Sequence, residues 1–235
     1  MAAILPSSLL LAFDADDTLW PNQPHFDQVE ARLFKIMAHC GDASYISTHL
    51  NEVQHRNMQL FGYGAKSFML SMIETAIQLT QGAVTGHDIQ QILDMGKELL
   101  RFPIEPLPGV VETLTELRRR GHRLLLLTKG DLFDQESKLA RSGLGELFDH
   151  VEVVSEKDEA TYRRLLTRYK ATVEEFVMIG NSLKSDILPV AKLGFRAVHV
   201  PYHTNWVFEH VDPTLLEDIT FEQVADIRAV LEMVR

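Results

Sequence analysis

The stretch SLLLAFDADDTLW, residues 8–20, decides the fold, because in it an apolar run ends abruptly in carboxylates. Residues 9–13 are continuously apolar, which predicts a strand buried on both faces of a sheet. Carboxylates inside such a strand would carry a large desolvation cost. We therefore expect Asp14 and Asp16 just beyond its carboxyl end, where open α/β sheets bind ligands. Two acids this close together indicate a cation nearby.

Composition and charge narrow the class of protein. The chain has 235 residues, 46% of them hydrophobic, and no apolar stretch long enough to cross a bilayer, so we expect no membrane partner. A formal net charge of −10 argues against nucleic acid as a partner. The single cysteine, Cys40, excludes an intrachain disulfide and, with no signal-peptide pattern at the N-terminus, predicts a cytoplasmic protein. Monomer and homodimer both remain open.

Residues 23–103 show only helical patterns, which predicts four helices without an intervening strand. Asp42 is placed to begin the second helix, and Gly62 and Gly64 to end it. Thr85 and Asp88 have the spacing of a capping box at the start of the fourth. The chain is therefore predicted to be an α/β core, formed by residues 1–22 and 104–235, with an all-helical insertion over residues 23–103.

Beyond Gly109, helical and strand patterns alternate. Strands are predicted over residues 123–127, 151–154, 176–179 and 197–200, and a last helix over residues 221–234. Alternation of this kind implies right-handed crossovers and a parallel sheet covered by helices on both faces. The predicted fold class is α/β with a Rossmann-like core.

Polar residues follow the later strands as well as the first. They are Thr128, Lys129 and Gly130 after the second strand, Lys157 after the third, and Asn181 and Asp186 after the fourth. Alone, each is more often a solvated or helix-capping residue than a functional one. A parallel sheet brings these strand ends to one edge, however, which predicts an oxygen-rich pocket with an ammonium group and free backbone donors. Hard oxygen ligands suit Mg²⁺.

The order and intervals of these residues resemble the four motifs of the haloacid dehalogenase-like hydrolases. Asp14–Leu19 resembles the first motif, Thr128 the second, Lys157 the third, and Gly180–Asp186 the fourth. The resemblance covers residues 9–202, and it implies that the helical insertion is the C1 cap of this family. It favours the phosphatase branch, because the dehalogenase branch lacks the second carboxylate of the first motif.

The resemblance implies roles for the first-motif residues. Asp14 is expected to attack phosphorus and form an aspartyl-phosphate. Asp16 is expected to protonate the leaving oxygen and then to deprotonate the hydrolytic water. We expect the acidic neighbours of Asp16 to raise its pKa. Asp17 is expected to be a turn residue with a left-handed backbone.

The remaining motif residues are expected to bind the phosphoryl group and the metal. The phosphoryl ligands would be Thr128, the amides of Lys129 and Gly130, and the ammonium group of Lys157. The resemblance implies that Mg²⁺ is held by Asp14, the backbone carbonyl of Asp16, Asp186 and Asn181.

The sequence thus predicts a Mg²⁺-dependent hydrolase of a small phosphorylated metabolite. Asn181 stands where the family usually has Asp, which leaves open a protein that binds a phosphoryl ligand without efficient turnover. A receiver-like signalling domain is a related alternative. Another reaction on the same scaffold, such as a phosphomutase or dehalogenase reaction, is a third, although Asp16 argues against the dehalogenase.

Overall fold

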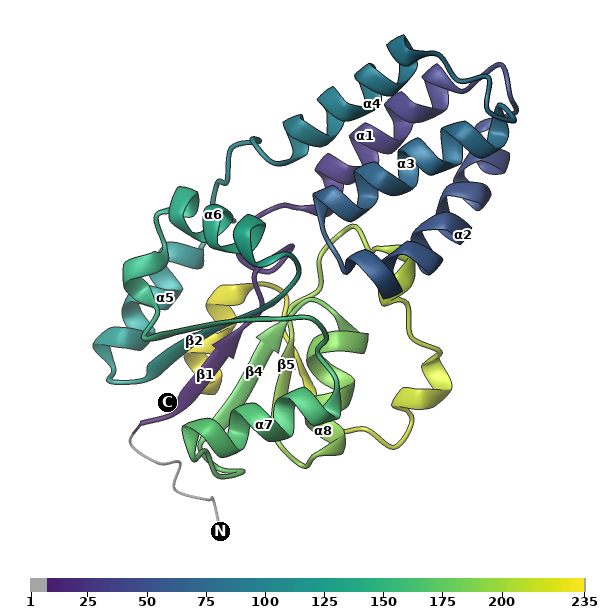
Figure 1. The fold of residues 1–235 in the computed structure, drawn as a ribbon. Coiled ribbons are helices and arrows are strands. Elements are labelled where there is room, and N and C mark those ends of the chain that lie inside the picture. Colours follow the sequence, from purple (N-terminus) through teal and green to yellow (C-terminus); the bar gives the residue numbers. More distant parts are fainter. Residues whose placement is uncertain (1–7, 235) are drawn as a thin grey trace. The chain divides into compact units, whose positions relative to one another are not determined.

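The computed structural model describes residues 8–234, which divide into two compact units (Figure 1). One unit contains the chain up to Gln23, residues Ile104–Lys129, and the chain from Gln135 onward. The other contains Pro24–Pro103 together with Gly130–Asp134. Residues 1–7 and 235, with which the predicted core begins and ends, lie outside the described residues.

The first unit is built on a sheet whose strands are all parallel. Within residues 8–234 the sheet has six strands, in the order β3-β2-β1-β4-β5-β6. Their bounds are β1 Leu10–Phe13, β2 Arg123–Lys129, β3 His150–Val154, β4 Phe176–Gly180, β5 Arg196–His199 and β6 Glu222–Gln223. The central strand β1 is wholly buried and pairs with β2 and β4, with Leu10 opposite both Arg123 and Phe176. The predicted α/β architecture is therefore confirmed.

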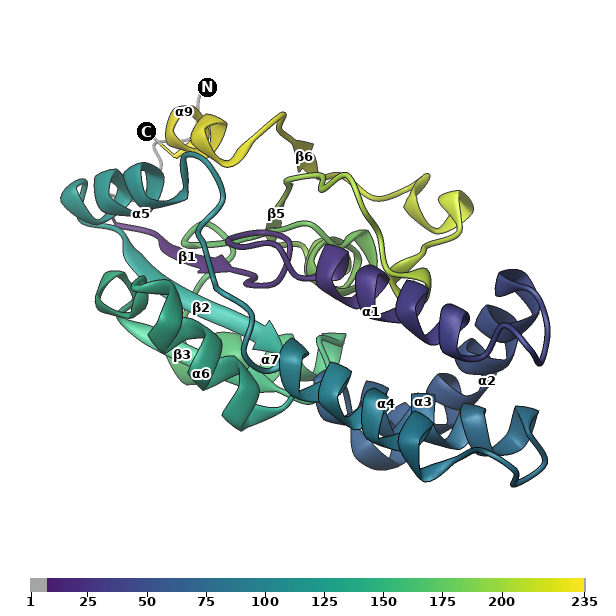
Figure 2. The same cartoon turned by 90° about the horizontal axis from the view of Figure 1, so that it is seen from above.

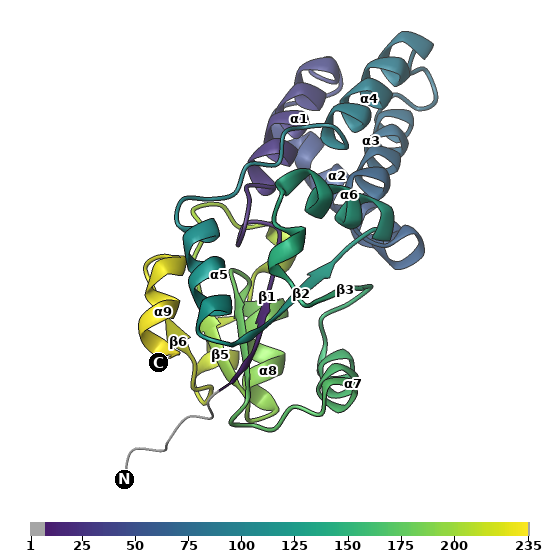
Figure 3. The same cartoon turned by 90° about the vertical axis from the view of Figure 1, so that its left-hand side faces the viewer.

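Helices cover both faces of this sheet. They are α5 Val110–Arg119, α6 Leu132–Ser142, α7 Glu159–Tyr169, α8 Leu188–Lys192 and α9 Val230–Met233. Helices α5 and α9 contact each other on one side of the sheet, and α7 lies on the other (Figure 3). Beneath α7, Tyr162 and Leu165 pack on Leu10, Leu125 and the side chains around them. Because alternate strand residues face opposite sides, burial on both faces explains the continuous apolar runs.

The second unit consists of helices α1 Gln23–Ile36, α2 Ala43–Phe61, α3 Ala65–Leu79 and α4 Gly86–Leu99. Helix α3 packs against both α2 and α4 (Figure 2). Asp42 caps α2 by accepting from the Tyr45 amide, and Thr85 forms a capping box with Asp88, so both predicted helix starts are confirmed. The core of this unit is apolar and its own, with Leu33, Met72 and Ile92 among its members.

One predicted element is wrong. The single helix expected over residues 221–234 is replaced by the short strand β6, a 3-10 turn at Ile227–Ala229 and the one-turn helix α9. Val224 donates to the carbonyl of His199, which extends the pairing of β6 with β5. Pairing with an open sheet edge satisfies backbone groups that a helix would otherwise satisfy internally. Among the residues described, no helix is long and apolar enough to cross a membrane.

Candidate active site

The site forms where β1 and β4 end. Asp14 directly follows β1, and its Oδ1 lies 2.5 Å from the Nζ of Lys157. The same Nζ lies 2.7 Å from Oδ1 of Asp186, which comes from the turn after β4. All three side chains are buried. One ammonium group is thus shared by two carboxylates.

Charge and burial oppose each other here. Burial raises the pKa of Asp14 to about 7 in spite of Lys157, and the nearby Asp186 adds to the increase. Burial also raises the pKa of Asp186. Burial alone would lower the pKa of Lys157, but the two carboxylates outweigh it and raise that pKa above its ordinary value. The cluster therefore has more negative than positive charge, which a cation would relieve.

The Thr18 hydroxyl joins the first and fourth motifs. Its Oγ1 lies 2.9 Å from Oδ2 of Asp14 and 3.2 Å from Oδ1 of Asn181, and it accepts from the Asn181 amide. The two oxygens of Asp14 are thus held by different groups, Lys157 and Thr18. Asp17 has a φ of 62°, which confirms its predicted left-handed backbone. Its carboxylate accepts from the amides of Asn22 and Gln23.

A π-helical turn, Leu183–Ile187, presents Asp186. Ser182 caps this turn by accepting from the Ser185 amide, and its own amide donates to Oδ2 of Asp186. Gly180 ends β4, and a Cβ at this position would clash with the Asp186 carboxylate. Wide turns of this kind are often found at functional sites. The geometry explains why glycine precedes Asn181.

Asp16 has a separate environment. Its Oδ1 accepts from Nε1 of Trp20 at 2.8 Å, and its Oδ2 accepts from Nε2 of Gln135 at 2.9 Å. The Nζ of Lys138 lies 3.0 Å from both oxygens. Burial acts to raise the pKa of Asp16, but Lys138 and the two neutral donors outweigh it, so the pKa is lowered. The expectation of a raised pKa is wrong, because Lys138, a residue distant in sequence, together with the two neutral donors outweighs the effect of burial.

The second motif lies at the end of β2. Thr128 is buried there, in register with Val153 of β3. The side chain of Lys129 is engaged elsewhere, since its Nζ lies 2.6 Å from Oε1 of Glu209 and 3.1 Å from Oγ of Ser185. What Lys129 offers a ligand is therefore its amide. Gly130 begins the short segment that groups with the helical unit.

Sequence reasoning missed three residues around this site: Gln135, Lys138 and Glu209. Gln135 and Lys138 are three residues apart on α6, a spacing that shares a helix face. The available signal in the sequence was this spacing, which does not identify Asp16 as the partner. Glu209 ends the 3-10 turn Val207–Glu209 and accepts from Ser182, Ser185 and Lys129. Nothing local in its sequence indicates this contact with the fourth motif.

The donor set fits a hard divalent cation. Among residues 8–234, no three His, Cys, Asp or Glu side chains gather as a metal site. An ion here would therefore combine the carboxylates of Asp14 and Asp186 with the amide oxygen of Asn181 and a backbone carbonyl. These are all oxygen ligands, and they surround a cluster with excess negative charge. Both properties suit Mg²⁺.

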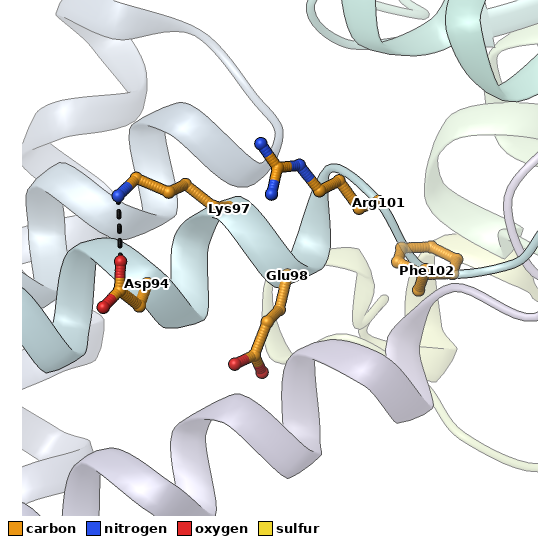
Figure 4. Close-up of a pocket in the computed structure, with 5 residues that line it drawn as sticks. All are labelled: Asp94, Lys97, Glu98, Arg101 and Phe102. Atoms are coloured by element: carbon orange, nitrogen blue, oxygen red, sulfur yellow. Dashed lines mark hydrogen bonds and ion pairs between the residues drawn. The ribbon is translucent and has the colours of Figure 1, made fainter.

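A pocket of about 490 Å³ lies on the helical unit (Figure 4). Its lining consists of Asp94, Lys97, Glu98, Arg101 and Phe102. Lys97 pairs with Asp94 at 2.8 Å, and Glu98 forms an ion pair with Arg32 of α1. Acids and bases are balanced in this lining, so the pocket has no marked preference for an anion or a cation.

Comparison with known proteins places this geometry in a family. A sequence model of the haloacid dehalogenase-like hydrolases matches residues 9–194, and the chain belongs to this family. The crystal structure of such a hydrolase from Xanthomonas campestris is 38% identical and superposes with a TM-score of 0.84, over 97% of this chain and 92% of the other. The predicted family is therefore confirmed.

Curated relatives of this chain carry phosphatase names. A glyceraldehyde 3-phosphate phosphatase from Methanothermobacter thermautotrophicus is 27% identical over 164 residues, which are 67% of this chain and 68% of the relative. A phosphoserine phosphatase from Thermus thermophilus is 30% identical over 139 residues, which are 57% of this chain and 52% of the relative.

Proposed function

We propose that this hydrolase is a Mg²⁺-dependent phosphatase that releases phosphate from a small phosphorylated metabolite. One observation carries the proposal: the Asp14 carboxylate lies at the end of β1, oriented by Lys157 on one oxygen and Thr18 on the other. A fixed, buried carboxylate beside an ammonium group suits attack on an anionic phosphoryl group. The phosphatase names of the curated relatives support the same reaction.

In the first step, an oxygen of Asp14 attacks phosphorus, and the bond from phosphorus to the ester oxygen breaks. The product on the protein is an aspartyl-phosphate. Lys157 offsets the charge of one phosphoryl oxygen. The Thr128 hydroxyl and the Lys129 amide hold the remaining phosphoryl oxygens. When bound between Asp14, Asp186, Asn181 and the Asp16 carbonyl, Mg²⁺ would neutralise the carboxylates and polarise the phosphoryl group.

Asp16 is the residue that donates a proton to the leaving oxygen and accepts one from the hydrolytic water. Its lowered pKa leaves it ionised in the free protein. A dianionic phosphate ester bound nearby raises that pKa, so Asp16 takes up a proton with the substrate. It gives this proton to the leaving oxygen. Asp16 then removes a proton from the water that attacks phosphorus in the intermediate, which releases phosphate and regenerates Asp14.

The helical unit, in this proposal, is the C1 cap of the family. Caps of such enzymes exclude water and contact the organic part of the substrate. The compounds hydrolysed by the two named relatives, glyceraldehyde 3-phosphate and phosphoserine, are both small, so a panel of compounds of this size is the appropriate search.

The test is phosphate release from such a panel, with Mg²⁺ and with EDTA, for wild type and Asp14→Asn. We expect turnover only with Mg²⁺, and a loss of at least about a thousandfold in Asp14→Asn. The variant is isosteric, and its melting temperature verifies that it is folded. An active, folded Asp14→Asn protein would refute the assignment of the nucleophile.

Asn181 motivates a second candidate, a protein that binds a phosphoryl ligand without turnover. The family usually has Asp at this position, so the neutral amide of Asn181 leaves one negative charge fewer beside Thr18. If wild type releases no phosphate from any compound yet binds Mg²⁺ by calorimetry, the binding function is favoured. Asn181→Asp then restores the carboxylate, and gain of turnover in that variant would identify the missing charge as the reason.

A further inference from the structure

Helix α6 brings a buried cation to Asp16. The Lys138 side chain is only 3% exposed, and its Nζ lies 3.0 Å from both oxygens of Asp16 and 2.8 Å from Oδ1 of Asn22. A buried ammonium group without a compensating charge would be strongly destabilising. The ion pair with Asp16 therefore accounts for the position of Lys138.

Two neutral donors complete the arrangement. Trp20 donates to Oδ1 of Asp16, and Gln135 donates to Oδ2. Each carboxylate oxygen thus has one neutral donor and a share of the ammonium group. Rotation of the carboxylate about its Cβ–Cγ bond would break four contacts at once. The plane of the Asp16 carboxylate is therefore fixed from both edges.

This set of contacts is separate from the one around Asp14. The side-chain bonds of Asp14 are to Lys157 and Thr18, and Lys157 also bonds Asp186, so the two aspartates bond different groups. Asp14 and Asp16 thus pair with different buried lysines. Because the first-motif carboxylate that Lys138 pairs with is Asp16, removal of Lys138 is expected to affect chiefly the steps in which Asp16 takes part.

We propose that Lys138 is a positioning residue for the proton transfers of this enzyme. Together with Gln135, it holds the Asp16 carboxylate in the orientation that meets the leaving oxygen and then the hydrolytic water. Lys138 acts through Asp16 and does not itself contact the substrate. The proposal rests on the proposed phosphatase function.

The leaving group provides the discriminating test. An alkyl phosphate releases a strongly basic oxygen that needs a proton, whereas p-nitrophenyl phosphate releases a stable anion that does not. Lys138→Met keeps the length of the side chain and removes its charge. We expect kcat for the best alkyl phosphate of the panel to fall about a hundredfold, with KM within about twofold. The loss for p-nitrophenyl phosphate should be clearly smaller.

Three further variants make the test specific. Asp16→Asn should show the same dependence on leaving group, and the double variant should lose no more than Asp16→Asn alone, because both changes remove one function. Arg163→Met, which removes an exposed cation of α7, is the matched control and should leave both activities unchanged. Gln135→Leu removes one neutral donor. It should show the same dependence of kcat on the leaving group, with smaller losses, and it provides a test even if Lys138→Met does not fold.

The outcomes separate the two proposals. Equal losses for both substrates, a change in KM alone, or losses that multiply in the double variant would overturn the role of Lys138 while leaving the phosphatase intact. Should Lys138→Met fail to fold, an unchanged Gln135→Leu enzyme would overturn it equally. Wild-type protein inactive on every compound would overturn the phosphatase function, and the role of Lys138 with it.

Discussion

Two aspartates only two residues apart have opposite electrostatic environments. Asp14 shares Lys157 with a second carboxylate, and burial raises its pKa to about 7. Asp16 pairs with Lys138, and its pKa is lowered. Environments that separate the pKa values of neighbouring acids commonly separate their roles. Here the raised pKa of Asp14 means that the free protein disfavours ionisation of the proposed nucleophile, and a cation bound beside Asp14 would lower that pKa.

Asp17 offers a prediction about pH. Burial raises the pKa of Asp17 from 3.8 to about 7, even though two backbone amides donate to it. The folded state therefore holds a proton that the unfolded state has lost, so this residue reduces stability as pH rises from 3.8 towards about 7. Asp17→Asn removes the titration, keeps one acceptor oxygen and tolerates the left-handed backbone.

We expect the difference in unfolding free energy, wild type minus Asp17→Asn, to fall by about 1 kcal/mol or more between about pH 5 and about pH 8. Urea unfolding in the presence of a chelator measures it. Comparison with the variant cancels the titration of groups that do not interact with Asp17. A difference that stays constant with pH would show that Asp17 does not titrate in this range.

The sequence predicted the residues that lie directly at strand ends, because a buried apolar run limits where a carboxylate can stand. Asp14 is such a residue, whereas Asp186 lies farther along the chain, in the π-helical turn after β4. The structure brings both to Lys157. Lys138 and Glu209 could not be found in this way. Their contacts with Asp16 and Ser182 cross more than one element, and periodicity gives a residue's face without giving its partner.

At the scale of elements, segments with clear hydrophobic periodicity were predicted correctly, and segments with a weak pattern were not. The four helices of the insertion have helical periodicity and recognisable caps, and all four are present. Residues 221–234 have apolar positions that fit a helix, yet part of this stretch pairs with β5. The sequence does not indicate the π-helical turn Leu183–Ile187, since one additional residue per turn leaves no mark on a short pattern.

Glu209 links two elements of the site, and we predict a structural effect of its removal. Its largely buried carboxylate accepts from Lys129 of β2 and from Ser182 and Ser185 around the π-helical turn. Glu209→Gln keeps the size of the side chain but leaves the Lys129 ammonium group with less compensation. Breaking a buried ion pair typically destabilises by about 3 kcal/mol. We therefore expect a clearly lower urea midpoint.

Glu98→Gln is the matched control for Glu209→Gln. Glu98 pairs with Arg32 on the helical unit, and both side chains are about half exposed. An exposed pair contributes at most about 1 kcal/mol, so this variant should unfold close to wild type. Equal midpoints for Glu209→Gln and Glu98→Gln would contradict a bracing role for Glu209.

At the scale of the whole molecule, each unit has a separate apolar core. The segments that lead into and out of the helical unit meet within the α/β unit, where the Leu107 amide donates to the Leu19 carbonyl at 2.8 Å. We predict that replacing Pro24–Pro103 with a short flexible linker leaves the α/β unit folded. The ion pair of Lys66 with Asp131 would be lost, but it is partly exposed and contributes at most about 1 kcal/mol.

Far-UV circular dichroism and thermal unfolding test the shortened chain, with the full chain as reference. We expect a mixed helix and strand spectrum and a single cooperative transition. A chain that aggregates, or that melts without a transition, would show that the α/β unit depends on the insertion for its stability.

The insertion also bears on the order in which the chain folds. Strand β1 cannot pair with β2 until β2 has been synthesised, since Leu10 pairs with Arg123. The helices of the insertion are synthesised after β1 and before β2. Their contacts are local in sequence, which favours rapid folding. Once formed, this unit stacks the rings of His25 and Phe102 at 3.9 Å and so brings its own two ends together. Closure of β1 onto β2 then spans a short effective loop, with a correspondingly smaller loss of chain entropy.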